Sequence, residues 1–387
     1  MSTKNTNPSA LAAASVGLAA LASAMGIGRF SLTPILPLMQ QDAGLSLTVG
    51  GWLATANYVG YLLGAISCVA FSPPAGPAIR WGLLSVAVTT LWMGLSDWQP
   101  LWMGLRFVSG AASAFVLIGT SAWAMPILRS HGREQWSGHV FSGVGIGIAF
   151  AGLFGLSAGI EVWGSRGTWI ALGAVAMTLA FVLWRPLATG STVDTAAAPG
   201  LRTLSRPVIV VAACYAAFGF GYIIPATFLP ALASDYIHDP AMFGLVWPVF
   251  GAAAALSTFG SAWLGRGLAP RQLWMRAKWV LAAGVLAPAL VINLATLLFS
   301  AVCVGGTFMI ITMAGIREAL RLGGAPAPLA VGVMTAAFGA GQIVGPLTVS
   351  MLGRSGHAFA LASGIAALGL VAGNCGLLFF AREAEPV

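Results

Sequence analysis

The chain has 387 residues, of which 58% are hydrophobic and only 7% are charged, and its formal net charge is +8. An ordinary soluble protein is about 45–50% apolar and about 25% charged, so a water-soluble domain of this composition would lack the polar residues to cover its surface. The basic residues are scattered at segment ends and do not gather on one face, which excludes nucleic acid as a partner. With a mean hydropathy of +0.89, the sequence predicts a polytopic membrane protein.

Apolar segments long enough to cross a bilayer, which takes about 20 residues, follow one another along the whole chain. They are 10–39, 48–72, 77–96, 99–129, 135–158, 166–186, 206–234, 241–265, 271–287, 289–317, 327–352 and 357–381. No cleavage motif precedes the first segment, so we expect it to be retained as a helix. The pattern predicts an all-α membrane protein with twelve transmembrane helices.

One long polar connection, 187–205, divides the twelve spans into six and six. It is rich in Ala, Thr, Ser and Gly, a composition typical of flexible linkers. We therefore expect an N-terminal six-helix bundle over 1–186, a cytoplasmic linker over 187–205 and a C-terminal six-helix bundle over 206–387.

The basic residues in the loops predict the orientation, because cytoplasmic loops carry the excess of Lys and Arg. If both termini are cytoplasmic, the opposite side carries only Arg166 and Arg354, and the cytoplasmic side carries fourteen: Lys4, Arg80, Arg129, Arg133, Arg185, Arg202, Arg206, Arg266, Arg271, Arg276, Lys278, Arg317, Arg321 and Arg382. Arg29 and Arg106 fall within spans. We expect a multi-pass protein of the bacterial inner membrane with both termini in the cytoplasm.

The first span contains an unusual group of residues: Arg29, the glycines Gly26 and Gly28, and the prolines Pro34 and Pro37. An arginine inside a membrane span costs roughly 2.5–3.5 kcal/mol on insertion scales. We interpret the stretch as the floor of a ligand site, with the glycines and prolines serving helix packing or gating.

An internal repeat relates each residue to the one 193 positions later. Identical pairs at this offset are Gly26 with Gly219, Gly28 with Gly221, Leu36 with Leu229, Pro37 with Pro230, Gly51 with Gly244, Phe115 with Phe308 and Gly152 with Gly345. The offset predicts two parallel six-helix pseudo-repeats, an arrangement whose ligand site lies near the membrane midplane between the repeats.

The first two spans, GIGRFSLTPILPLMQQDAGLS and GWLATANYVGYLLGA, resemble the YbfB/YjiJ-type bacterial major facilitator transporters. At the level of the superfamily, the element beginning at Arg106 resembles its Arg-x-x-x-Gly motif, and Gly143, Gly145 and Gly147 resemble its glycine-rich motif. The loops 72–82 and 264–271 depart from the superfamily pattern because neither contains an acidic residue. The resemblance implies the major facilitator fold, transport by alternating access, and a central cavity lined by spans one, four, seven and ten.

The acidic residues limit the cargo. All ten carboxylates fall in loops or at helix ends, whereas an antiporter of cationic drugs needs a buried acid. The four cysteines lie in apolar segments without ligand spacing, so we expect no metal and no cofactor. No set of Ser, His and Asp shares one depth, which speaks against an enzyme.

Four polar residues share a depth of roughly 10–15 Å below the outer surface at about 1.5 Å of rise per residue: Arg29, Arg106, Asn57 and Gln342. Tyr222 occupies the repeat position of Arg29, and Phe299 that of Arg106; with Phe218 they would form an apolar wall. Two cations facing apolar surface predict a small, partly apolar organic anion, with its carboxylate on the guanidinium groups. The partners expected are this substrate and the lipid bilayer, with a proton left open, for a monomeric protein.

Each of these residues also has a structural interpretation. Arg106 could extend toward the interface near Asp97, and Arg29 could bind carbonyls freed by the helix break near Pro34. Asn57 and Gln342 could join helices, and Tyr222 could be a core aromatic. For the whole protein, the alternatives are an exporter of lipophilic drugs or metabolites and a non-transporting membrane sensor.

Overall fold

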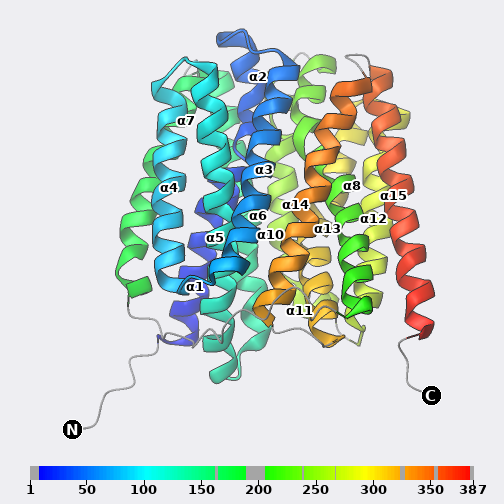
Figure 1. Ribbon diagram of the computed structural model, residues 1–387. Helices are drawn as coiled ribbons and strands as arrows, with labels where there is room; N and C mark the ends of the chain where they lie inside the picture. The colour runs from blue at the N-terminus through cyan, green and yellow to red at the C-terminus, as the bar shows by residue number, and fades with distance from the viewer. Residues whose placement is uncertain are drawn as a thin grey trace.

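In the computed structural model the helices run along one common direction, with α1 beginning and α15 ending at the same end of the bundle (Figure 1). We call this the terminus end and the other the far end.

The structure describes residues 8–161, 164–188, 205–237, 239–265, 267–322, 327–352 and 356–383. The helices are α1 (Ala10–Leu21), η1 (Ala22–Arg29), α2 (Leu32–Asp42), α3 (Leu47–Phe71), α4 (Ala75–Leu95), α5 (Gln99–Ser130), η2 (Glu134–Trp136), α6 (Ser137–Glu161), α7 (Gly164–Trp184), η3 (Pro186–Ala188), α8 (Arg206–Tyr236), α9 (Pro240–Phe243), α10 (Val246–Phe259), α11 (Ser261–Leu264), α12 (Pro270–Leu290), α13 (Leu294–Arg321), α14 (Ala327–Leu352) and α15 (Gly356–Glu383).

Within the described residues, twelve helical segments are long and apolar enough to cross a membrane. Large apolar side chains on these segments remain exposed, including Leu256 at 74%, Leu368 at 71% and Phe181 at 67%. Apolar surface of this kind requires lipid as its solvent. The prediction of an all-α membrane protein with twelve spans is confirmed.

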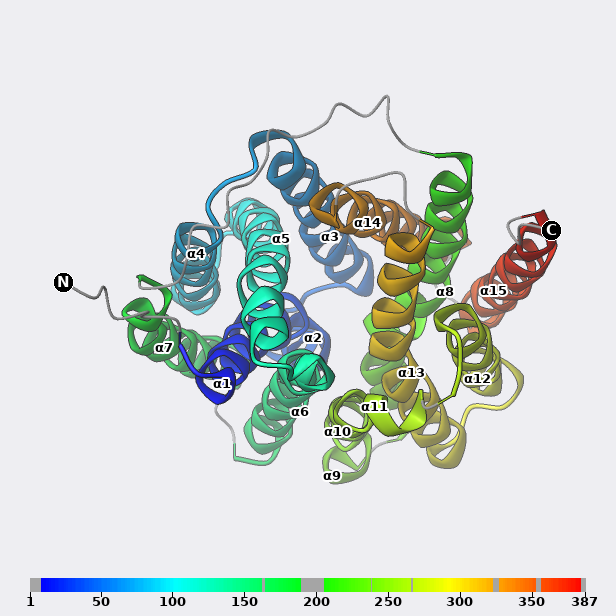
Figure 2. The same ribbon diagram turned by 90° about the horizontal axis from the view of Figure 1, so that it is seen from below.

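The helices form two groups, α1–α7 and α8–α15, which lie on opposite sides of the view from the terminus end (Figure 2). The groups meet where α6 packs against α10, α3 against α14 and α2 against α8. At the last contact, the hydroxyl of Thr33 donates to the carbonyl of Ala226 at 3.1 Å, and these residues are 193 positions apart, the offset of the predicted repeat. The predicted linker 187–205 lies outside the described residues except at its two ends.

The boundary between the ninth and tenth spans differs from the prediction. The chain leaves α12 at Leu290 and starts α13 at Leu294, whereas the predicted spans ended at 287 and began at 289. Asn293 caps α13, because its Oδ1 accepts from the backbone N–H of Thr296 at 2.9 Å while Thr296 Oγ1 accepts from the N–H of Asn293 at 3.1 Å. This reciprocal cap, and not the nearby Pro288, sets the boundary.

Lys278 was wrongly counted among the loop cations. It lies well inside α12, which begins at Pro270, and its side chain is 0% exposed. Arg271 and Arg276 precede it on the same helix, so the sequence alone does not separate the buried cation from the solvated ones. The loop cations expected on the cytoplasmic side are therefore thirteen, one fewer than predicted.

Candidate functional site

The first span is not one continuous α-helix. Residues Ala22–Arg29 between α1 and α2 are π-helical, and the N–H of Phe30 bonds to the carbonyl of Met25, five residues back, at 3.1 Å. Glycines stabilise an α-helix poorly, and the prolines at 34 and 37 lack the N–H that a regular helix would use. The segment therefore has carbonyl groups that must find other donors inside the protein.

Arg106 on α5 supplies two of these donors. Its Nη1 bonds to the carbonyl of Gly28 at 2.9 Å and its Nη2 to the carbonyl of Arg29 at 2.7 Å. The side chain is 2% exposed, so it does not extend to the interface, and Asp97 instead pairs with Arg166 at 3.8 Å. The helix-break carbonyls are bound by Arg106, whereas the sequence had suggested Arg29 for this role.

Two serines on α5 complete the support of the π-helical segment. Ser109 Oγ donates to the carbonyl of Gly28 at 2.9 Å, and Ser113 Oγ donates to the carbonyl of Ala24 at 2.8 Å. Together with Arg106 they form a line of donors one turn apart along α5, facing the opened helix. The helix break and this face of α5 therefore form one structural unit.

Arg29, by contrast, has a guanidinium group with free donors. The side chain is 2% exposed and stacks on the ring of Tyr61, with Cζ 3.6 Å from the ring centroid; the rings of Tyr58 and Phe30 lie at 5.4 and 5.5 Å. Its Nη2 donates to Gln342 Oε1. Among the described residues, its Nε and Nη1 have no partner, and no carboxylate pairs with it. A buried cation inside a membrane span with unused donors is a candidate for a functional group.

Gln342 and Asn57 have different positions relative to Arg29. Gln342 on α14 reaches Arg29 from the other helix group, and its Nε2 has no partner in the described part of the chain. Asn57 on α3 donates to the backbone carbonyl of Arg106 at 2.9 Å and so joins α3 to α5. Gln342 therefore contacts Arg29 directly, whereas Asn57 contacts the backbone of Arg106.

An aromatic wall from the second helix group lies across from Arg29. Tyr222 stacks on Phe308 with ring centroids 5.3 Å apart and on Phe338 at 5.6 Å, while Phe218 stacks on Phe338 at 5.2 Å. Phe308 meets Phe30 edge to face at 6.3 Å, which connects the wall to the surroundings of Arg29. The buried hydroxyl of Tyr222 has no partner among the described residues.

The structure does not bring Phe299 to this wall. Its side chain is 49% exposed, because the buried face of α13 at this level contains Leu297, Ser300 and Ala301. The repeat offset identified the right helix but the wrong face. Phe308, further along the buried face of α13, takes the expected place.

Sequence reasoning missed the other tyrosines of the site. The chain has five tyrosines, and four of them, Tyr58, Tyr61, Tyr215 and Tyr222, are buried at 4% exposure or less. Tyrosines of membrane proteins usually lie at the interfaces. In the sequence these tyrosines fall in the middle of predicted spans and are spaced three residues apart (58 and 61) or seven apart (215 and 222). This spacing could have indicated that each pair lies on one buried helix face.

The two helix groups close on each other at the far-end side of Arg29. The hydroxyls of Tyr58 and Thr227 hydrogen-bond across the groups at 2.9 Å. The pocket between Arg29, Leu36 and Thr227 has a free volume of about 0 Å³. In this conformation the space beside Arg29 is filled by the protein's own side chains.

The five glycines predicted to serve packing or gating all lie at close helix contacts. A Cβ at Gly26 would overlap the backbone of Gly147, and one at Gly147 would overlap the backbone of Ala22. Gly143 faces the backbone of α1 in the same way, Gly145 faces the backbone of α10, and Gly28 faces the side chain of Val86 on α4. Gly145 therefore lies at a contact between the two helix groups.

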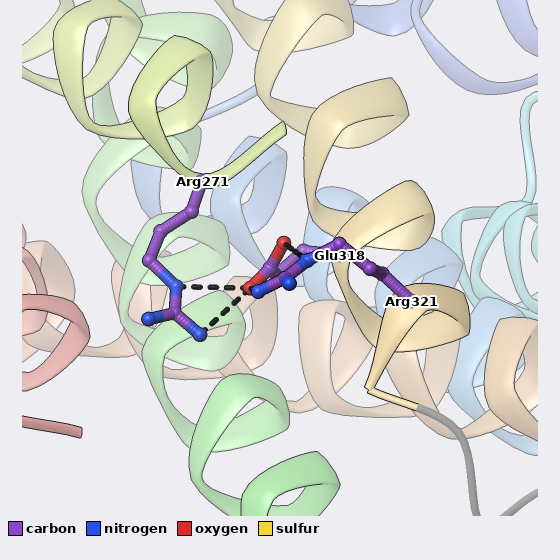
Figure 3. Close-up of polar contacts among 3 residues, drawn as sticks. All are labelled: Arg271, Glu318 and Arg321. Atoms are coloured by element: carbon purple, nitrogen blue, oxygen red, sulfur yellow. Dashed lines mark hydrogen bonds and ion pairs between the residues drawn. The ribbon is translucent and has the colours of Figure 1, made fainter. Parts of the chain in front are cut away.

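A cluster of charges at the start of α12 and the end of α13 consists of Arg271, Glu318 and Arg321 (Figure 3). Glu318 is 0% exposed and binds Arg271 at 2.8 Å and Arg321 at 2.9 Å. The loop 264–271 lacks an acid of its own, but the end of α13 supplies one. The cluster ties the start of α12 to the end of α13.

Three comparisons place the chain among known proteins. A family model described as "Uncharacterised MFS-type transporter YbfB" matches residues 21–378. The "Uncharacterized MFS-type transporter YceJ" of Bacillus subtilis (strain 168) is 28% identical over 206 residues, which cover 48% of this chain and 46%, about half, of that relative. A crystal structure of a mutant of the nucleoside transporter NupG superposes with a TM-score of 0.68 at 13% identity, covering 94% of this chain and 99% of that one. At this identity the last likeness shows the fold alone.

Proposed function

Since this chain belongs to the YbfB family of MFS-type transporters, we propose that it carries a small, partly apolar organic anion, a carboxylate, across the membrane by alternating access. The observation that carries the proposal is Arg29, a buried guanidinium between the two helix groups with unused donors and no carboxylate partner in the described part of the chain. The aromatic wall of Tyr222, Phe308 and Phe338 gives the apolar part of the ligand its contact surface.

The free donors suit a carboxylate. The Nε and Nη1 atoms of Arg29 carry three of the five N–H bonds of a guanidinium group, and none of the three has a partner among the described residues. Guanidinium binds carboxylate through paired, charge-assisted hydrogen bonds. The amide of Gln342 and the hydroxyl of Tyr222 offer further donors from the other helix group.

The charge of the site supports a ligand with one negative charge. Two cations had been expected, but both Nη atoms of Arg106 bind the carbonyls of Gly28 and Arg29. Only Arg29 then faces the ligand as a cation. A second carboxylate would be buried without a partner, which is costly, so monocarboxylates are favoured over dicarboxylates.

The stacked rings also favour a second candidate, a flat uncharged or lipophilic molecule. NupG, which shares the fold, is named a nucleoside transporter, and stacked rings suit bases or lipophilic drugs. Such a ligand would leave the donors of Arg29 unsatisfied, so we place this candidate second.

We further propose that the terminus end faces the cytoplasm of a bacterial inner membrane, as the loop cations indicate, and that the protein acts as a monomer. Single cysteines at Arg133 and Ala43, in a cysteine-free background, test the orientation. A membrane-impermeant thiol reagent added to intact cells should label the second and not the first. The reverse pattern contradicts the orientation.

The substrate class is tested by exchange in proteoliposomes, with ligands that differ in one feature each. Benzoate and benzamide have nearly the same shape but differ in charge; phthalate adds a second carboxylate, and uridine represents the nucleosides. We expect exchange of benzoate alone, and a decrease of about 10–100-fold for Arg29→Gln, the equivalent of about 1.5–3 kcal/mol for hydrogen bonds to a charged group.

The matched control is Arg166→Gln, which removes a cation that is 61% exposed and should leave exchange unchanged. Arg29→Lys keeps the charge but loses the planar pair of donors, so its exchange should also fall strongly. Equal exchange of benzoate and benzamide, or unchanged exchange in Arg29→Gln, would exclude the anion site. Exchange of uridine would support the second candidate.

A further inference from the structure

Lysine is almost absent from this chain. Of its 18 basic residues, only Lys4 and Lys278 are lysines and the other 16 are arginines. Arginine thus supplies nearly every loop cation, and the chain uses lysine at one position inside a membrane span. The difference matters chemically because arginine keeps its proton in proteins, whereas lysine can release it.

Lys278 lies in a tight pocket between α8, α12 and α15. Its side chain is 0% exposed, and Nζ lies 3.5 Å from the carbonyl of Cys214 on α8 and 5.1 Å from the ring centroid of Trp274 on its own helix. Gly373 on α15 makes room for the amine, since a Cβ there would lie 2.8 Å from Nζ. The shape of the pocket therefore depends on the amine.

No negative charge balances Lys278 in the described part of the chain. On α8 the ionisable groups nearby are Cys214 and Tyr215, which meets Trp274 edge to face at 5.9 Å. The facing residues on α15, Gly373 and Asn374, do not ionise.

On α12, Arg276 is exposed, and Arg271 binds Glu318 of α13 at the terminus end, 2.8 Å apart. Cys303 lies opposite Gly284, further along α12. An ammonium group buried without an anion is costly. Unlike an arginine, a lysine can remove that cost by losing its proton.

The neighbouring residue on α15 carries an unused acceptor. Asn374 donates through Nδ2 to the carbonyl of Met275 at 3.2 Å, one turn before Lys278, while its buried Oδ1 has no partner among the described residues. Gly373, the residue before Asn374, faces Nζ of Lys278, so this acceptor lies on the stretch of α15 that packs against the lysine.

One helix connects this pocket to the contacts between the helix groups. Cys214 lies on the terminus-end half of α8, and Ala226 and Thr227, which bond to the first group, lie on its far-end half. Pro225 lies between them inside the helix, where the missing N–H weakens the helix and favours a bend. A change in the contacts of Cys214 can thus alter the angle at which the far-end half of α8 meets α2.

We propose that Lys278 is the proton-binding site of this transporter, taking up one proton as ammonium in one conformation and releasing it as neutral amine in the other. The exchange is Lys-NH₃⁺ to Lys-NH₂ plus one proton, which passes to water when the pocket opens. It requires no buried carboxylate, and the one buried carboxylate of the described residues, Glu318, is held by two arginines. The site is separate from Arg29 and does not depend on the identity of the substrate.

The proton is observed directly in the Lys4→Arg variant, in which Lys278 is the only lysine. Lysine labelled with ¹³C at Cε then gives a single NMR resonance, whose shift distinguishes ammonium from amine. We expect this resonance to move between the two positions as the pH is varied over the range in which the protein stays folded. A resonance that stays at either position through this range would overturn the proposal.

The link to conformation is tested with spin labels at Ser130 and Leu320, at the terminus ends of α5 and α13, in a cysteine-free background. The distance distribution between them should depend on pH in the parent protein. Lys278→Arg should hold the low-pH distribution at every pH, and Lys278→Met the high-pH distribution. Retained pH dependence in both variants, or none in the parent, would refute the proposal; if neither variant folds, the resonance of the single lysine still decides it.

Discussion

The first span and its predicted repeat partner α8 share two glycines and one proline but differ in backbone conformation. The shared pairs are Gly26 with Gly219, Gly28 with Gly221 and Pro37 with Pro230. Yet the first span is π-helical over Ala22–Arg29, whereas α8 is helical without interruption over Arg206–Tyr236. Residues that weaken a helix are therefore not sufficient to open it here.

The neighbouring helix makes the difference. On α5, Arg106, Ser109 and Ser113 donate hydrogen bonds to the carbonyls of the opened segment. The residues 193 positions later, on α13, are Phe299, Val302 and Gly306, whose side chains donate none. A carbonyl freed inside a membrane needs such a donor, so the helix break occurs only where the adjacent helix provides one.

The strongest test of this comparison is Arg106→Met. It removes two charge-assisted bonds and leaves the carbonyl of Arg29 without a donor, so we expect a loss of about 3–5 kcal/mol of stability. Thermal unfolding in detergent, followed by tryptophan fluorescence, measures it as a large decrease in Tm. Arg166→Met, at a residue that is 61% exposed, is the control. An unchanged Tm for Arg106→Met would show that the break does not depend on α5.

Gly26→Ala tests the close approach of the opened segment to α6. The added methyl group would overlap the backbone of Gly147, which cannot move like a side chain, and overpacking of this kind costs about 1–3 kcal/mol. Gly104→Ala on α5 is the matched control, because a Cβ there meets nothing within 4 Å. Its Tm should stay level or rise slightly, as alanine is the better helix former. Equal Tm values for the two variants would contradict the close packing.

The sequence predicted the spans and the level of the site better than the direction of its side chains. Counting residues along spans placed Arg29, Gln342 and Arg106 at one depth, and the structure brings the first two into contact. Depth carries no information on rotation about a helix axis. For that reason Arg106 was expected beside the ligand although it faces the backbone of the first span, and Phe299 was chosen although Phe308 lies on the buried face of α13.

Lys278 shows a different limit. Hydropathy describes a segment by its average, and α12 begins with several basic residues of which only this one is buried. The scarcity of lysine in the chain was visible in the sequence. The sequence alone could not show that Lys278 lies in a pocket, because that pocket is formed by α8 and α15, which are distant from α12 in the chain.

Smaller effects are expected at the serines of α5. Ser113→Ala removes the bond to the carbonyl of Ala24, and Ser109→Ala the bond to that of Gly28; each should cost about 1 kcal/mol. Ser121→Ala on the same helix is the control, since its hydroxyl bonds only to the carbonyl of Leu117 in its own helix, at 2.9 Å. If the control lowers Tm as much as the other two, the interhelical bonds add nothing to the opened segment.

The smallest loss of stability is expected for Tyr222→Phe. The same substitution should still weaken transport. The buried hydroxyl of Tyr222 has no partner among the described residues, so its removal loses no hydrogen bond and Tm should stay level or rise. Tyr58→Phe loses the bond to Thr227 that joins the helix groups at 2.9 Å, and its Tm should fall. If the Tyr222 hydroxyl donates to the carboxylate of the substrate, the apparent affinity in proteoliposomes should fall about 3–10-fold, as for one hydrogen bond of about 1 kcal/mol. An unchanged affinity would mean that the Tyr222 hydroxyl does not bind the substrate. The second helix group would then contribute only its aromatic surface and Gln342, and Arg29 alone would recognise the charge.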